Sequence, residues 1–256
     1  MAAASLQIVS DRIAALLRLP EVPDYPGAMN GLQLQNQSGV VVRLLAAVDA
    51  SLPVMRKAAA FPGPSLLLVH HGLFWKGAQM ITGAQFEKLR LAMEAGLALY
   101  SAHLPLDVHP RLGNNAQLAA ALGFKKTTPF FDWKGLPLGL RAKGKLTREA
   151  LAARLSAVLG GGPVHVCPGG PDQVREVGII TGGAGSEVSA IAATGVDTFI
   201  TGEGPHWSYP AAEEAGINVL YGGHYATETF GVKALAAHLG EAFKLPWEFI
   251  DHPTGL

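Results

Sequence analysis

The sequence contains a single cysteine, Cys167, among its 256 residues, so it cannot form an internal disulfide. A chain that depends on no disulfide suits a reducing compartment, and we expect this protein in the cytoplasm. Long apolar runs are also missing, since none approaches the roughly 18 residues that a transmembrane helix needs. The apolar stretch at the start of the chain is interrupted by Asp11 and Arg12. This interruption is typical of an amphipathic helix and argues against a secretion signal.

An excess of charge of either sign is absent as well. The 20 basic and 20 acidic residues cancel, and no block of Lys and Arg runs along the chain. The charge pattern therefore argues against a surface for nucleic acid or anionic membranes, and it favours small molecules or proteins as partners. What the sequence does have is 49% hydrophobic residues, enough for a large core in one domain or in two lobes.

Predicted strands and helices alternate along the chain, which indicates an α/β fold with mainly parallel sheets flanked by helices. Helices are expected at residues 5–19, 52–60, 86–95, 116–122, 148–159, 186–193, 210–215 and 229–243, with Ser51, Asn115 and Thr147 as the caps of the second, fourth and fifth. Strands are expected at residues 40–48, 65–71, 97–103, 164–167, 177–181, 196–203, 217–224 and 247–251. The composition changes to aromatics, prolines and lysines between Phe124 and Pro137. We therefore expect two lobes, 1–125 and 126–256, and leave open that the C-terminal segment packs back on the first lobe.

The strand expected at residues 65–71 ends in two adjacent histidines, His70 and His71. Open α/β sheets bind ligands at the carboxyl ends of their strands, so these imidazoles are candidate ligands for a metal ion. Neighbouring residues of a strand point to opposite sides, which favours two ions over one ion held by both rings. The alternative is structural, with one histidine ending the strand and the other buried in the core.

The two halves of the sequence repeat the same order of elements, and the repeat includes polar residues at matching positions. Aligning Tyr100 with Tyr221 places His103 opposite His224 and Asp107 opposite Glu228. The same alignment places His71 opposite Glu203. A purely structural duplication would preserve apolar spacing and turns, and it has no need to preserve histidines and carboxylates. The lobes are therefore interpreted as an internal duplication that carries a site.

The candidate residues all lie at the carboxyl ends of predicted strands: His70, His71, His103, Asp107, Glu203, His206, His224 and Glu228. Imidazole and carboxylate donors without thiolate suit Zn, Mn, Fe, Co or Ni in a hydrolytic site. Each residue also has a structural alternative, such as a hydrogen bond to a backbone carbonyl, a turn, or an acid in the first turn of a helix. Cys167 lies outside these positions and is interpreted as inert. The remaining histidines, which are interpreted as structural, are His109, His165, His238 and His252.

Seven short segments spread over nearly the whole chain resemble one known family. They are NGLQL (30–34), VDAS (48–51), LLVHHGLFW (67–75), SAHLPLD (101–107), GNNAQLAAALG (113–123), TGEGPHW (201–207) and GGHYATE (222–228). Together they are similar to the dinuclear metal-centre proteins called GTP cyclohydrolase 1 type 2 homologues, the Nif-three-like family. The resemblance implies a two-lobed α/β fold, a toroidal homohexamer and two divalent ions per chain. One departure is Gly72, where the family usually has proline after the histidine pair.

The resemblance also implies a role for each candidate residue. The implied metal ligands are His70, His71, Asp107, His224 and Glu228, with Glu228 bridging the two ions. His103, Glu203 and His206 are then pocket residues that can move protons during catalysis.

Two hypotheses of function follow from these observations. The first is a metal-dependent hydrolase that acts on a nucleotide-like small molecule. The second is a non-catalytic toroidal scaffold or a protein for metal handling and protein association. The segment Gly139–Lys145 nearly spells a phosphate-binding P-loop, but Leu146 replaces the required Ser or Thr, so a P-loop is not expected there.

Overall fold

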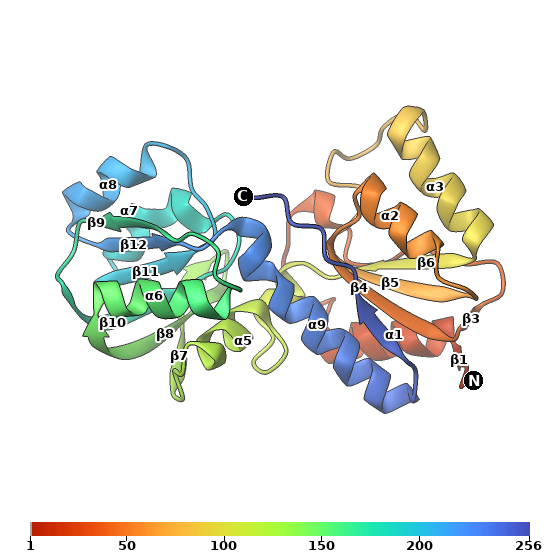
Figure 1. Cartoon of the computed structure of the whole chain (residues 1–256), viewed down its shortest axis with the longest axis horizontal. Helices are drawn as coiled ribbons and strands as arrows, with labels where there is room; N and C mark the ends of the chain where they lie inside the picture. Colours follow the sequence, from red (N-terminus) through yellow and green to blue (C-terminus); the bar gives the residue numbers. More distant parts are fainter. Residues whose placement is uncertain (1) are drawn as a thin grey trace. The chain divides into compact units, whose positions relative to one another are not determined.

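The computed structural model describes residues 2–256, which form two units of α/β structure (Figure 1). The first unit comprises residues 2–106 and 231–252, and the second comprises residues 107–230 and 253–256. This division differs from the boundary at residue 125 that the change of composition suggested. The segment rich in aromatics and prolines lies in a hairpin of the second unit's sheet, so its unusual composition belongs to strands. No helix within residues 2–256 combines the length and apolar character that crossing a membrane requires.

The sheet of the first unit has the strand order β13-β4-β5-β6-β2. Its strands are β2 (Gly31–Leu34), β4 (Arg43–Asp49), β5 (Ser65–His71), β6 (Leu97–Ser101) and β13 (Trp247–Phe249). Strands β13, β4, β5 and β6 pair in parallel, and β2 pairs with β6 in the antiparallel direction. A separate short antiparallel pair joins β1 (Ala4–Ser5) to β3 (Val40–Val41). The parallel direction of β4, β5 and β6 brings their carboxyl ends to one edge of the sheet.

Helices cover both faces of this sheet. The helical segments of this unit are α1 (Leu6–Leu17), the short 3-10 helix η1 (Pro26–Ala28), α2 (Leu52–Ala59), α3 (Gly83–Ala95), α4 (Leu104–Asp107) up to residue 106, and the part of α9 (His224–Phe243) that follows residue 230. Met55 of α2 and Ala92 of α3 share a buried cluster with Leu67 of β5. The neighbouring residues Leu66 and Leu68 are also buried, because α1 and α9 lie on the other side of the sheet (Figure 1). Burial on both faces explains why β5 is a continuous apolar run.

The sheet of the second unit has the strand order β7-β8-β10-β11-β12-β9. Its strands are β7 (Thr127–Trp133), β8 (Leu136–Thr147), β9 (His165–Pro168), β10 (Gln173–Ile179), β11 (Thr198–Thr201) and β12 (Asn218–Tyr221). Strands β10, β11 and β12 pair in parallel, while β7, β8 and β9 join in antiparallel directions. This sheet is therefore mixed: β10, β11 and β12 are parallel to one another, and the strands that flank them run antiparallel to their neighbours.

Two helical layers cover the second sheet. The helices are α5 (Asn114–Ala121), α6 (Arg148–Val158), the 3-10 helix η2 (Ala184–Glu187), α7 (Val188–Ala192), α8 (Ser208–Ala215) and the first part of α9. Leu118 of α5 and Leu155 of α6 pack with Ile200 of β11 on one face. Ile191 of α7 packs with the neighbouring Phe199 on the other face. Alternate residues of β11 thus enter two different cores, as the two-residue period of a strand requires.

The two units share one arrangement of strands. In the first unit β4, β5 and β6 are parallel neighbours in chain order, and in the second β10, β11 and β12 have the same relationship. The third strand of each set leads to a histidine, His103 after β6 and His224 after β12. This correspondence matches the duplication inferred from the sequence.

Two local expectations differ from the structure, and a third, that residues 139–145 form no P-loop, agrees with it. Asn115 was expected to cap a helix, but the cap of α5 is Gly113, and Asn115 instead accepts a hydrogen bond from the Thr181 backbone N–H at 2.9 Å. Helix α9 was expected to begin at residue 229, but it begins at His224. The P-loop-like segment Gly139–Lys145 lies inside strand β8 and is not a loop.

Candidate metal centre

Three of the predicted histidines lie together in the first unit, at the carboxyl ends of β5 and β6. The ring centroids of His70 and His71 are 4.8 Å apart, and those of His70 and His103 are also 4.8 Å apart. One ligand nitrogen from each of the three rings lies within 4.8 Å of the other two. The expectation that His70 and His71 point to opposite sides is therefore wrong. His71 is the last residue of β5, where the regular alternation of a strand ends.

The first two rings are each held through Nδ1. His70 Nδ1 lies 2.9 Å from the carbonyl oxygen of Ala102, and His71 Nδ1 lies 2.8 Å from a carboxylate oxygen of Asp49. A carbonyl or an ionised carboxylate can only accept a hydrogen bond, so Nδ1 is the donor in both rings. In a neutral ring of this tautomer the lone pair is on Nε2, and imidazoles that bind metals are usually oriented in this way.

His103 is held by Asp24, a loop residue that was not predicted from the sequence. The Asp24 carboxylate accepts hydrogen bonds from His103 Nδ1 at 2.8 Å, the Leu104 N–H at 2.9 Å, Asn30 Nδ2 at 2.7 Å and the Tyr25 N–H at 2.7 Å. Burial alone would raise the pKa of Asp24, but the hydrogen bonds from His103, Asn30 and Tyr25 and the charge of His103 hold it below its usual value. The aspartate is thus kept ionised and fixes the tautomer of His103.

Gly72, the departure from the family pattern, leaves space that Gln33 occupies. A Cβ at position 72 would lie 2.4 Å from the amide nitrogen and oxygen of Gln33. That amide accepts a hydrogen bond from the Leu73 N–H at 2.7 Å and donates to the carbonyls of Ala28 and Met29, both at 3.0 Å. The turn after the histidine pair is therefore braced by Gln33 from strand β2.

The second unit contains further donors around the start of α9. His224 and Glu228 are one helical turn apart, which brings His224 Nε2 to 3.1 Å from a Glu228 carboxylate oxygen. A carboxylate oxygen of Asp107 lies within 4.8 Å of one from Glu228, and Asn114 Nδ2 donates to Asp107 at 2.7 Å. Glu203 follows β11 and lies 2.9 Å from His224 Nδ1. Because Asp107 and Glu228 are buried, two negative charges so close together favour a bound cation.

The electrostatics of this group are dominated by its carboxylates. Burial lowers the pKa of His224, but the hydrogen bonds and charges of Glu228 and Glu203 outweigh burial and raise the pKa to about 9. Gly182 forms part of the wall, because a Cβ there would lie 2.1 Å from Glu228 Oε1. Its φ of +72° also lies in the region that favours glycine. Close approach and backbone conformation together require glycine at this position.

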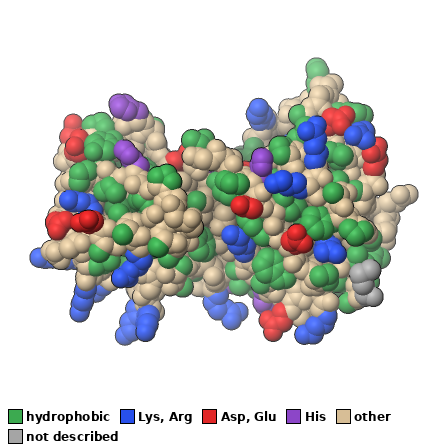
Figure 2. All heavy atoms as spheres, in the orientation of Figure 1, with side chains coloured by type: hydrophobic (Ala, Val, Ile, Leu, Met, Phe, Trp, Pro, Cys, Tyr) green, Lys and Arg blue, Asp and Glu red, His purple; other side chains and the backbone are tan. Residues whose placement is uncertain are grey.

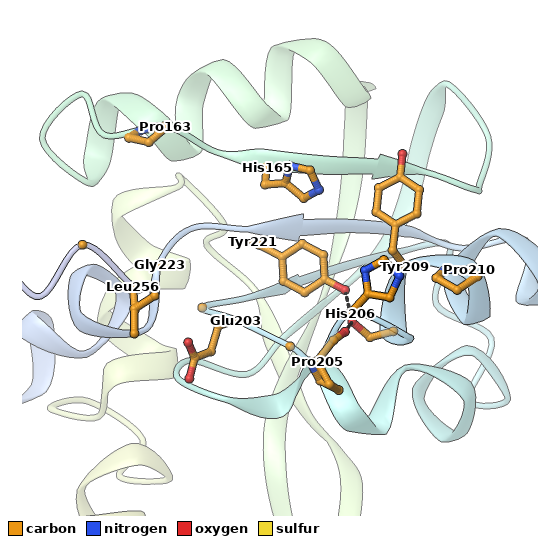
Figure 3. Close-up of a pocket in the computed structure, with 14 residues that line it drawn as sticks. Pro163, His165, Glu203, Pro205, His206, Tyr209, Pro210, Tyr221, Gly223 and Leu256 are labelled. Carbon is orange, nitrogen blue, oxygen red and sulfur yellow. Dashed lines mark hydrogen bonds between the residues drawn. The ribbon is translucent and has the colours of Figure 1, made fainter.

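A pocket of about 720 Å³ adjoins these donors within the second unit (Figure 3). Glu203 lines it and also holds His224, while His206, predicted as a pocket residue, lines it from the segment after β11. His165 was interpreted as structural, but it lines the same pocket, with its ring centroid 6.0 Å from that of Tyr221. The Tyr221 hydroxyl is fixed by Ser208 Oγ at 2.7 Å. The volume and the mixture of aromatic and polar walls are typical of small-molecule sites.

The donor atoms of these residues are of the kinds that divalent metal ions prefer. Four imidazoles, those of His70, His71, His103 and His224, share one arrangement in which Nδ1 faces a carbonyl or carboxylate acceptor. The accompanying buried carboxylates are oxygen donors without any thiolate. Such nitrogen and oxygen sets suit Zn, Mn, Fe, Co or Ni. The structure therefore contains groups that can hold a metal, in agreement with the sequence.

Comparisons with known proteins find the same family over nearly the whole chain. The model of the family Duf34/NIF3 (NGG1p interacting factor 3) matches residues 10–254. A relative from Deinococcus radiodurans called GTP cyclohydrolase 1 type 2 homolog is 42% identical over 247 residues, which are 94% of this chain and 90% of the relative. The structure of TTHA1606 from Thermus thermophilus is similar with a TM-score of 0.89 and 40% identity, over 99% of this chain and all of that chain. The structure of the protein ybgI, titled as of unknown function, is similar with a TM-score of 0.91 and 35% identity, over the same shares.

Proposed function

Because the chain belongs to the Duf34/NIF3 family, we propose that it is a hydrolase that uses two divalent metal ions and acts on a nucleotide-like small molecule. The observation that supports this proposal most is the shared arrangement of the four histidines. Each Nδ1 is bound by an acceptor, which orients the ring and raises its basicity as a ligand. A purely structural histidine has no need for the same orientation in four separate places.

We assign the two ions to His70, His71, Asp107, His224 and Glu228, with Glu228 as a ligand of both. The family resemblance is the ground for combining these five donors. The geometry within each unit supports the assignment, because His70 and His71 lie side by side and Glu228 lies near both His224 and Asp107. The identity of the metal is open among Zn, Fe, Mn, Co and Ni.

When bound, two divalent ions lower the pKa of a coordinated water and polarise the substrate, so that hydrolysis proceeds at neutral pH. The chain's own residues then handle substrate and protons. Glu203 and His206 line the pocket of about 720 Å³ and are proposed to exchange protons with the substrate. His103 is proposed as a further proton carrier, with its tautomer fixed by Asp24.

The experiment is a metal analysis of the purified protein followed by a turnover screen over nucleotides and related heterocycles, since the relatives are called GTP cyclohydrolase 1 type 2 homologues. We expect two divalent ions per chain and turnover of at least one compound. Glu203→Gln should keep the metal and lose most of the turnover. Glu214→Gln, a change of the same kind at an exposed position of α8, should behave as the parent protein does.

The non-catalytic alternative makes a different prediction for the same measurements. A scaffold would retain two ions but turn over no compound, and Glu203→Gln would then have no effect beyond stability. Absence of any bound metal in the parent protein would reject both the hydrolase and the metal-bound scaffold.

We also infer that the protein assembles as a toroidal homohexamer. The family resemblance is the main support, and the first unit exposes several large apolar side chains that suit an interface between subunits. Among them Met80 is 86% exposed, Ile81 60% and Met93 65%. Light scattering at micromolar concentration should report a hexamer, and a monomer would reject this inference.

A further inference from the structure

A notch in the edge of the second sheet forms a hollow that the proposed hydrolase does not use. Strand β7 begins at Thr127, which pairs with Ala142 of β8. Within the described part of the chain, β7 therefore offers no partner to residues 143–147 of β8. A hollow of about 1000 Å³ lies at this place. Its lining residues are Gly123, Phe124, Lys125, Lys126, Thr128, Arg141, Ala142, Lys143, Lys145 and Glu176.

Basic side chains reach this hollow from two segments. Arg141, Lys143 and Lys145 are alternate residues of β8, and all three line the hollow. Lys125 and Lys126 come from the connection between α5 and β7. Lys and Arg side chains project from the surface over β7 and β8 in Figure 2. The basic residues that make the segment Gly139–Lys145 resemble a P-loop therefore lie on a strand and line this hollow.

The positive charge of the hollow is largely uncompensated. Arg141 donates to Glu176 at 2.8 Å and to the carbonyls of Thr194 and Gly195, so the guanidinium and the Glu176 carboxylate neutralise each other. The remaining four side chains, which we call the lysine notch, are Lys125, Lys126, Lys143 and Lys145. Across residues 2–256 none of the four is within ion-pair distance of a carboxylate.

This concentration of charge is not a consequence of a basic protein, because 20 basic and 20 acidic residues balance over the whole chain. Four ammonium groups around one hollow repel one another, and a polyanion removes that repulsion. Lysine is a common point-charge ligand of phosphate. Phe124 is the aromatic ring among the lining residues, and it is half-buried, so stacking on a base contributes little here.

We infer that the lysine notch is a binding site for the phosphate chain of a small molecule, either a free oligophosphate or the triphosphate of a nucleotide. Recognition is by charge and by the concave shape of the notch. The site is separate from the metal donors and does not depend on the proposed hydrolysis. The competing explanation is that these lysines only protect an open sheet edge from pairing with other chains.

The test is a calorimetric titration of the full-length protein with tripolyphosphate. We expect one site per chain, and an affinity that falls about tenfold between about 50 mM and 200 mM salt, because salt screens the attraction between the exposed lysines and the anion. Lys143→Ala/Lys145→Ala should weaken binding by about tenfold or more, because two of the four point charges are removed. Lys125→Ala/Lys126→Ala should weaken it to a similar extent from the other side of the notch.

Two control variants test whether binding depends on the lysine notch itself. Arg12→Ala/Arg56→Ala removes the same net charge from exposed positions of the first unit and should leave the affinity unchanged. His71→Ala removes a proposed ligand of one metal ion and should bind tripolyphosphate as the parent does, as expected of a site that does not involve that ion. Adenosine triphosphate in place of tripolyphosphate distinguishes the two sources: equal affinity assigns the site to the phosphate chain alone, and tighter binding assigns it to a nucleotide.

Three results would overturn the inference. The first is no detectable binding of tripolyphosphate to the parent protein at low salt, which would leave the lysines as protection of the edge. The second is binding that both double-lysine variants retain while circular dichroism shows them folded. The third is binding that His71→Ala abolishes, which would place the phosphate at the metal centre.

Discussion

The Asp24 carboxylate and the His103 ring are joined by a hydrogen bond of 2.8 Å across 79 positions of the chain. The same carboxylate accepts from the backbone N–H of Leu104, and Asn30 of the Asp24 loop accepts from the His103 N–H at 2.7 Å. The loop between α1 and β2 is therefore tied to the segment after β6 through both the side chain and the backbone of His103. This explains why a long connection near the start of the chain is ordered beside the candidate site.

Asp24→Asn should destabilise the protein by about 1–3 kcal/mol near neutral pH, the usual cost of weakening a buried charged hydrogen-bond network. The pKa of Asp24 is lowered in the folded protein relative to its ordinary value of 3.8. A lowered pKa stabilises the fold at every pH above the ordinary value, and this stabilisation is lost as the pH falls through the folded value. The difference between parent and variant should thus shrink in acid.

Urea unfolding of both proteins at neutral and acidic pH measures this difference. Asp172→Asn is the matched control, since Asp172 is an exposed partner of Arg148 at 3.7 Å, and such pairs contribute little. A difference between parent and Asp24→Asn that stays constant down to acidic pH would show that the charge of Asp24 does not stabilise the fold.

Gly182→Ala should reduce metal content as well as stability. Its Cβ would lie 2.1 Å from Glu228 Oε1, so the proposed bridging carboxylate must move. Gly216→Ala is a matched control with a similar φ of +68° and no atom within 4 Å of the added Cβ. Both variants carry backbone strain of about 1 kcal/mol, and metal analysis should separate them. Equal metal content in the two variants would mean that Glu228 tolerates the displacement.

Glu228→Gln should lower the occupancy of both ions, because the residue is proposed to be a ligand of each. The neutral amide is a much weaker ligand for a divalent cation than a carboxylate. Metal analysis after dialysis against limiting metal is the measurement, with Glu214→Gln as the control. Loss of one ion alone would restrict Glu228 to a single metal, and full retention would reject its role as a ligand.

Cys167 should react slowly with thiol reagents in the folded protein. Its side chain is fully buried, and burial raises the pKa of the thiol, with a further contribution from the charge of Glu213. The thiolate is the reactive form, so both effects protect the residue. Titration with a chromogenic disulfide should give no thiol in the native protein and one after denaturation. Rapid reaction of the native protein would indicate that β9 opens readily.

Local sequence patterns predicted most elements of the fold and failed where the partner of a residue is distant. Ser51 and Thr147 cap their helices as expected, because both bond to N–H groups three residues ahead. Asn115 looked like a cap by the same rule, but its partner Thr181 is 66 positions away. Asn115 could either cap the helix or bond to Thr181, and tertiary packing decides between the two. Local sequence preference cannot reveal that choice.

In the candidate site, too, local sequence patterns identified some residues and missed those whose partners are distant along the chain. His70 and His71 were identifiable because they end an apolar strand, and Glu228 because it repeats Asp107. Asp24 and Asp49 were missed, since each acts on a histidine that lies 79 or 22 positions further along the chain. Asp49 in the segment VDAS was a usable signal, because this acidic residue ends the strand that precedes β5. Parallel neighbours end at the same edge, so the end of β4 lies beside the end of β5.

His103→Ala separates a proton carrier from a metal ligand. One ligand nitrogen of His103 lies within 4.8 Å of those of His70 and His71, so its position alone permits either role. As a proton carrier, His103→Ala should keep its metal and lose about 100-fold or more of the turnover, the usual scale for a general acid or base. His224→Ala, at the duplicated position, should instead lose metal.

The variant His103→Ala also breaks the hydrogen bond to Asp24, and Asp24→Asn controls for that loss because it disturbs the same pair and keeps the imidazole. If turnover falls in His103→Ala far more than in Asp24→Asn, the ring itself moves the proton. Metal loss in both His103→Ala and His224→Ala would make His103 a ligand. Should His103→Ala keep both metal and turnover, the proton transfer would pass to Glu203 or His206, which line the pocket beside His224.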